Sequence, residues 1–208
     1  MAALDLARPP QTLAQNTPKQ ASTMVHVKLP YDIEISLPAG WVLEDAASNK
    51  VRTDRATRIL DLANIPTGPG GALLTASPDG HLDRTSVIVS VIMRPSASQA
   101  QVAALDLPQL EQVNAQHKAD LEAGMAVEGS EMVNWFGCDR VRLGSLFSLV
   151  CRYAYRMPGR QPRTMESHRI FLGGGSVGFM LQAPVEEFGS RERDFAPIRA
   201  SFRASTLP

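Results

Sequence analysis

The 208-residue sequence has no long apolar run, very little cysteine and no net charge. It contains two cysteines and 6% aromatic residues, and 21 basic side chains balance 21 acidic ones. A helix that crosses a bilayer needs about 20 consecutive apolar residues. A disulfide-rich scaffold needs many more cysteines, and nucleic-acid binding by overall charge needs a basic surplus. We therefore expect neither a membrane-spanning segment nor a nucleic-acid partner.

The remaining composition is that of a folded globular domain. Hydrophobic residues make up 44% of the chain, charged residues make up 20%, and 15 glycines with 15 prolines indicate many turns. We find no repeat and no interior linker. The expected organisation is a flexible leader at 1–24, one domain at 25–204 and a short tail at 205–208.

The amino-terminal segment leaves two interpretations open. Residues 1–7 lack the basic and apolar regions of a signal peptide. The following stretch is rich in Pro, Gln, Asn, Thr and Ser, which is typical of a leader behind a cleaved signal or a lipid anchor. The protein is thus either periplasmic or membrane-anchored, with its signal removed, or cytoplasmic as written.

Hydrophobic periodicity predicts mainly strands. Alternating or continuous apolar segments bounded by turn residues predict strands at 25–29, 33–37, 72–76, 85–93, 135–143, 146–157, 164–172 and 176–183. A long helix is expected from Asp106 to Gly124. A short amphipathic helix is expected near the end, with Ser190 as its cap and Phe195, Ile198 and Phe202 on its apolar side. Residues 52–64 are ambiguous. This order predicts an α+β fold, with helices packed on a largely antiparallel sheet.

We find no pattern that indicates an enzyme. The run from Gly174 to Gly178 matches the nucleophile elbow of hydrolases, with Ser176 at its centre. A strand rather than a helix follows it, and the last histidine, His168, precedes it. The four histidines are too far apart for a metal-binding motif. We therefore expect no catalytic residue, metal or cofactor, and a hydrolase is the less favoured alternative.

The two cysteines can be placed in two ways. If Gly144 and Ser145 form a two-residue hairpin loop, Cys138 lies opposite Cys151 and a disulfide can form. The polar pattern favours an offset register, because Cys138 alternates with arginines whereas Cys151 lies in an apolar row. We favour two buried or half-buried thiols and keep the disulfide as the alternative.

The offset register also predicts a basic surface. In it Arg140, Arg142, Arg152 and Arg156 share one face of the sheet. Guanidinium groups arranged in this way bind acidic protein surfaces or phosphate through paired hydrogen bonds. The alternative is the ordinary solvated side of an antiparallel sheet. These four arginines are the candidate binding residues.

Two separated motifs resemble those of a known family. Residues 35–41, Ile-Ser-Leu-Pro-Ala-Gly-Trp, and residues 195–202, Phe-Ala-Pro-Ile-Arg-Ala-Ser-Phe, are similar to the two ends of PsbP-like domains. That family includes a photosystem extrinsic subunit, a Ran-binding release factor, DcrB-type bacterial lipoproteins and chaperones of type VI secretion effectors. The resemblance implies an α/β/α sandwich that binds other proteins and has no active site. It also implies that Trp41 and Phe202 are core residues.

Together these observations predict a non-enzymatic protein-interaction module, most simply of the bacterial cell envelope. The alternative is a cytoplasmic chaperone or adaptor for a secreted effector, which would expose an apolar groove for its client.

Overall fold

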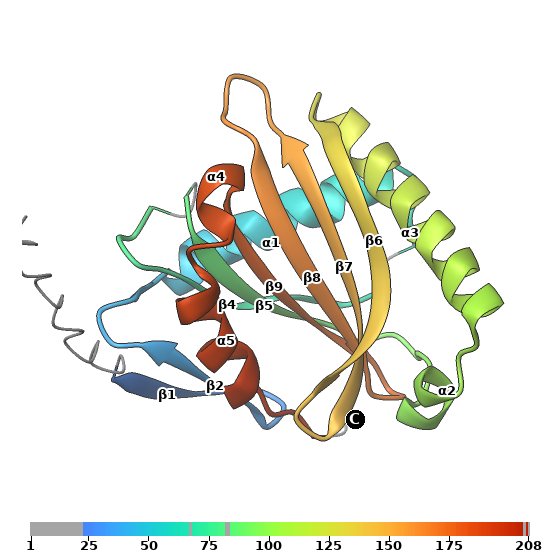
Figure 1. The fold of residues 1–208 in the computed structure, drawn as a ribbon, viewed down its shortest axis with the longest axis horizontal. Coiled ribbons are helices and arrows are strands. Elements are labelled where there is room, and N and C mark those ends of the chain that lie inside the picture. Colours follow the sequence, from blue (N-terminus) through green and yellow to red (C-terminus); the bar gives the residue numbers. More distant parts are fainter. Residues whose placement is uncertain (1–22, 67, 82–83, 206, 208) are drawn as a thin grey trace, which may run out of the picture.

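The computed structural model describes residues 23–66, 68–81, 84–205 and 207 (Figure 1). Almost all of the predicted leader therefore lies outside the described residues. The strands are β1 (Met24–Leu29), β2 (Ile33–Pro38), β3 (Val42–Leu43), β4 (Gly70–Ser77), β5 (Ser86–Ile92), β6 (Glu131–Leu143), β7 (Leu146–Arg156), β8 (Arg163–Phe171) and β9 (Ser176–Pro184). The helices are α1 (Ala46–Leu62), α2 (Gln99–Ala103), α3 (Leu107–Val127), α4 (Val185–Phe188) and α5 (Glu192–Ser201).

A seven-stranded antiparallel sheet forms the centre of the protein. Its strand order is β3-β4-β5-β9-β8-β7-β6, and β1 and β2 form a separate hairpin. The hairpin and α5 pack together on one side of the sheet, which we call the α5 face. On the other side α1 packs on β4 and α3 packs on β6, and we call this side the α1–α3 face. Figure 1 shows α4 and α5 in front of the sheet and α1 behind it.

The main hydrophobic core lies on the α5 face. Successive side chains of a strand point to opposite faces, and alternate residues of β5 and β9, such as Val89 and Phe179, are fully buried on this face. Phe202 is 0% exposed, and its ring centroid lies 5.3 Å from that of Phe179. Phe202 is thus a core residue, as the resemblance implied, whereas Trp41 is only partly buried at the edge of this core.

The long helix forms where the sequence predicts it. Asp106 accepts a hydrogen bond from the backbone N–H of Gln109, whose side chain accepts one from the backbone N–H of Asp106, so a capping box starts α3. The helix passes through Gly124 and ends before Gly129, which has a φ of 68° and so takes the left-handed conformation. The predicted α+β sandwich on an antiparallel sheet is confirmed.

Candidate binding cleft

A cleft of about 430 Å³ lies between α5 and the β6–β7 hairpin. Its floor is formed by Val150, Glu166 and His168, and residues 141–144 of the hairpin form one wall. The other wall is α5, where small side chains at Ala196 and Ala200 leave the space open. These two alanines are four residues apart and therefore lie on the same side of the helix. We call this feature the α5 cleft.

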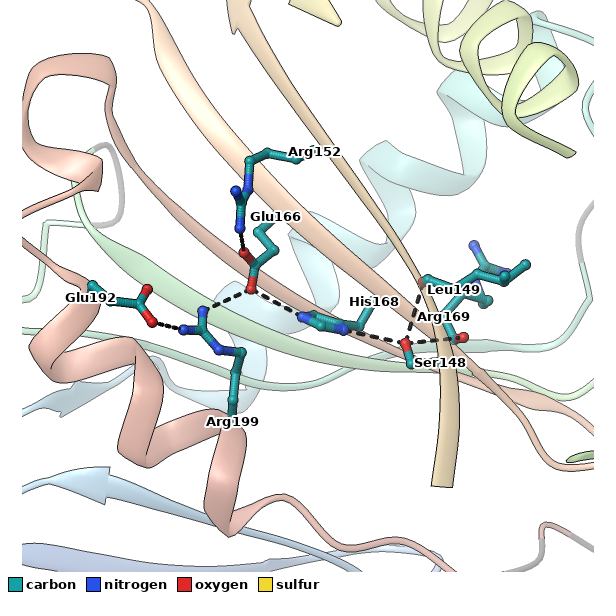
Figure 2. Close-up of polar contacts among 8 residues, drawn as sticks. All are labelled: Ser148, Leu149, Arg152, Glu166, His168, Arg169, Glu192 and Arg199. Carbon is teal, nitrogen blue, oxygen red and sulfur yellow. Dashed lines mark hydrogen bonds and ion pairs between the residues drawn. The ribbon is translucent and has the colours of Figure 1, made fainter. Parts of the chain in front are cut away.

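A buried carboxylate organises the floor of the α5 cleft (Figure 2). The Glu166 side chain is 3% exposed and receives hydrogen bonds from three residues. Arg199 Nη1 lies 2.8 Å from Oε1, His168 Nε2 lies 3.1 Å from the same oxygen, and Arg152 Nη2 donates to Oε2. The second amino group of Arg199 pairs with Glu192. Three chain segments thus meet at one carboxyl group.

These contacts determine the ionisation of Glu166. Burial by itself would raise the pKa of this carboxyl group, because it disfavours the charged form. The hydrogen bonds from His168 and Arg152, with the charge of Arg199, oppose that effect and lower the pKa from 4.5 to about 2. Glu166 is therefore ionised at neutral pH, and much of its capacity to accept hydrogen bonds is already used.

Ser148 extends this network but lacks access to a substrate. Its Oγ lies 3.3 Å from His168 Nδ1, so Ser148, His168 and Glu166 form a chain of the residue types found in hydrolase triads. Ser148 is 0% exposed, and its hydroxyl also lies within hydrogen-bond distance of the carbonyls of Leu149 and Arg169. A nucleophile must reach its substrate. These three side chains therefore form a structural network rather than a catalytic triad.

The serine of the elbow-like motif is not placed for catalysis either, as the sequence context indicates. Ser176 begins β9 and is 4% exposed, and its hydroxyl accepts a hydrogen bond from Arg169 Nη1 at 3.3 Å. The segment after it is a strand, as expected from the sequence.

The prediction that the four arginines share one face is wrong. Leu143 pairs with Leu146 around a two-residue loop, so Arg142 lies opposite Phe147 and Cys138 lies opposite Cys151. Gly144 takes the left-handed φ of 59° that such a loop needs. The geometry of the turn thus determines the register, against the polar pattern.

The corrected register separates the arginines into two pairs. Arg140 and Arg142 lie on the α1–α3 face, and Arg152 and Arg156 lie on the α5 face. Arg140 has a structural role, because it donates to the backbone carbonyls of residues 102, 103 and 105 at the end of α2. Arg156 pairs with Glu131 at 3.1 Å. Of the four, Arg152 lines the α5 cleft from the α5 face, and Arg142 borders it at the end of the β6–β7 hairpin, although its strand position belongs to the α1–α3 face.

The two cysteines form a disulfide across β6 and β7. Their Cα atoms lie 4.0 Å apart in directly opposed positions. The favoured expectation of two separate thiols is therefore wrong, for the same reason as the offset register. The bond ties the edge strand β6 to the interior of the sheet.

Comparison with solved structures identifies the fold. The cyanobacterial PsbP protein (CyanoP) of Synechocystis sp. PCC 6803 matches with a TM-score of 0.53 and 14% identity, over 92% of this chain and 97% of that one. The chain has a PsbP-like fold. LpqN, which is involved in cell envelope biogenesis of Mycobacterium tuberculosis, matches with a TM-score of 0.45 and 13% identity, over 96% of this chain and 99% of that one. No protein-family model and no curated protein matches the sequence.

The described residues were also searched for a membrane-spanning helix and for a metal-binding group of side chains. No helix in the described ranges is long and apolar enough to cross a membrane. Within the same part of the chain, no three His, Cys, Asp or Glu side chains are grouped so that they could hold a metal ion.

Proposed function

We propose that this chain is a non-enzymatic protein-interaction module of the cell envelope, and that its α5 cleft binds an acidic segment of a partner protein. The observation that supports this most directly is the distribution of hydrogen-bond donors in the cleft. Glu166 already receives hydrogen bonds from three residues, whereas the two arginines at the cleft opening keep donors that face solvent.

Arg142 and Arg152 provide these donors. The Arg152 side chain is 51% exposed, and its Nη2 contacts Glu166 while the guanidinium lies over the ring of Phe188. Arg142 is exposed, and its guanidinium lies 4.4 Å from the centroid of the Phe147 ring. An arginine held in this way loses little freedom when it pairs with a carboxylate. Acidic side chains of a partner therefore match the open end of the cleft.

The placement in the envelope rests on the disulfide. Cross-strand disulfides persist in the periplasm and outside the cell, whereas the cytosol keeps most thiols reduced. Cys138 and Cys151 are the two cysteines of the chain, and they are joined. This supports an exported protein, whether free in the periplasm or held by a lipid anchor.

One observation favours the alternative, a chaperone or adaptor for a secreted effector. A second hollow of about 500 Å³, with mainly apolar walls, lies beside Leu146, Leu172 and Ala204. Such a hollow could receive an apolar side chain of a client. Reduced cysteines in the native protein would accompany this function.

The test is a quantitative affinity capture from an extract of the source organism. The wild type is compared with Arg142→Glu and with the matched control Arg58→Glu, which reverses the charge of an exposed arginine on α1. We expect the wild type and the control to retain the same acidic partner, and Arg142→Glu to retain at least tenfold less. Equal retention by Arg142→Glu would remove the cleft as the binding site.

Mass spectrometry of the native protein tests the compartment separately. A disulfide-linked pair of peptides containing Cys138 and Cys151 supports the envelope. Free thiols together with an effector as the main captured protein would support the cytoplasmic alternative.

A further inference from the structure

The middle of the sheet is unequally covered on its two faces. On the α5 face, residues of the central strands such as Val89 and Phe179 are 0% exposed. On the α1–α3 face Ile88, Met165 and Gln182 of these strands are buried, but other residues remain partly exposed. We call six of these partly exposed residues the open strip: Ser90, Ile92, Ser167, Arg169, Gly178 and Met180.

The positions of the helices explain why the strip is open. α1 packs mainly on β4 and extends to the end of α3, where Arg55 pairs with Glu128, and α3 packs mainly on β6. Within their described residues α3 has no buried residue, and Asn49 is the buried residue of α1. The strip lies on β5, β9 and β8, which lie between β4 and β6 in the sheet.

The floor of the strip is low at its centre, where Gly178 lies opposite Ser90. A Cβ atom at Gly178 would come within 2.6 Å of Ser90 Oγ, so the serine hydroxyl lies over the glycine and no larger side chain projects from these two positions. Strands in a sheet are spaced by about 4.8 Å, so the distance from β5 to β8 is about 10 Å. This width fits an extended small molecule better than a helix, whose diameter with side chains is about 10–12 Å.

Arg169 is the charged group of the strip, and it lacks an acidic partner. Its Nη1 donates to Ser176 Oγ at 3.3 Å, and no carboxylate of the described residues forms an ion pair with it. Burial lowers the pKa of its guanidinium. Figure 2 shows Arg169 outside the Glu166 network, which reaches only its backbone carbonyl, through Ser148.

The helix that borders the strip adds no negative charge next to Arg169. The facing titratable group on α3 is His117, whose pKa is lowered by burial and then by the positive charge of Arg169. Asp120 on the same helix acts on His117 in the opposite direction. A buried charge without a counter-ion costs free energy, so an anion beside Arg169 would relieve this cost.

We propose that the open strip binds a small amphiphile with one carboxylate group. Arg169 binds the carboxylate, and the tail crosses Gly178 towards Met180. This site is on the opposite face of the sheet from the α5 cleft, so it is independent of the proposed protein-binding function.

Isothermal titration calorimetry with octanoate tests the proposal. We expect saturable binding to the wild type, at least tenfold weaker binding to Arg169→Gln, and unchanged binding to Arg152→Gln, which alters the α5 face. The neutral analogue 1-octanol and the tailless anions acetate and phosphate should each bind at least tenfold more weakly than octanoate. Equal binding of octanol, acetate or phosphate would overturn the proposal, as would absence of octanoate binding.

Two further measurements separate binding from folding. Because Arg169 has no acidic partner, Arg169→Gln should keep the thermal midpoint of the wild type or raise it. If this variant does not fold, Met180→Glu serves instead, because a carboxylate introduced into the strip should pair with Arg169 and abolish octanoate binding. Binding of a polyglutamate peptide at Arg169 in place of octanoate would make the strip a protein-docking site and would refute the proposal.

Discussion

Replacing Glu166 by glutamine tests the central network of the α5 cleft. The substitution keeps the size of the side chain and removes its charge, so Arg152, Arg199 and His168 lose their common acceptor. Removing one partner of a buried ion pair costs roughly 3–5 kcal/mol, because the remaining charge stays desolvated. Arg152 also reaches solvent, and Arg199 also pairs with Glu192, so neither charge is left fully uncompensated. We therefore expect a loss in the free energy of unfolding near the lower end of this range at neutral pH, at about 3 kcal/mol.

The pKa of Glu166 gives the same magnitude and adds a pH dependence. Folding lowers this pKa from 4.5 to about 2, and a tenfold change in an acid constant is worth about 1.4 kcal/mol. The ionised carboxylate therefore stabilises the folded state by roughly 3 kcal/mol. Because the pKa is lower in the folded state, this stabilisation is complete above about pH 5. It is lost progressively as the pH falls towards 2.

Urea unfolding between pH 7 and pH 2 measures this effect. We expect the free energy of unfolding to differ between wild type and Glu166→Gln by about 3 kcal/mol at pH 7, and the difference to shrink steadily below pH 5. Comparing the two proteins cancels the other carboxyl groups. The control Glu131→Gln, in an exposed pair with Arg156, should change stability by less than about 1 kcal/mol. A pH-independent difference between wild type and Glu166→Gln would refute the reasoning.

Three other substitutions or treatments test the fold. Phe202→Ala should cost about 3–5 kcal/mol in urea unfolding, since this side chain is 0% exposed; a loss below about 1 kcal/mol would mean that it is not in the core. Reduction of the disulfide between Cys138 and Cys151, which are 13 residues apart, should cost about 3 kcal/mol, and an unchanged urea midpoint with reductant would contradict this. Arg140→Ala should cost about 1.5–3 kcal/mol through the lost contacts at the end of α2, whereas the affinity capture of the acidic partner should be unaffected.

The sequence predicts the elements whose burial is strong and regular. β5 and β9 carry alternating apolar residues because one face of each strand lies in the main hydrophobic core, and α3 has a capping box that can be read from Asp106 and Gln109. α1 was ambiguous because its helix buries only Asn49 among its described residues, so no apolar stripe marks it. Its amino-terminal cap, Asp45, was the available signal: its side chain accepts a hydrogen bond from the backbone N–H of Ser48.

The errors in the sheet have one physical origin. The alternation of Cys138 with arginines suggested a solvated face, but Arg140 is used to bind the end of α2 and Arg142 lies over Phe147. A polar residue in a strand thus does not establish that its face is open to solvent. The left-handed glycine at position 144 was the better indicator, because loop length determines which residues pair.

The candidate site itself could not be read from the sequence, because its contacts are long-range. Glu166 and Arg199 are 33 residues apart, and the sheet brings Arg152 next to Glu166 only through the β7–β8 register. The same register places Arg169 on the opposite face, where it has no acidic neighbour among the described residues. On one face of the sheet, β8 therefore places Glu166, whose carboxylate already accepts hydrogen bonds from three residues. On the other face it places Arg169, which has no carboxylate partner among the described residues. This difference is why we assign the two faces to different ligands.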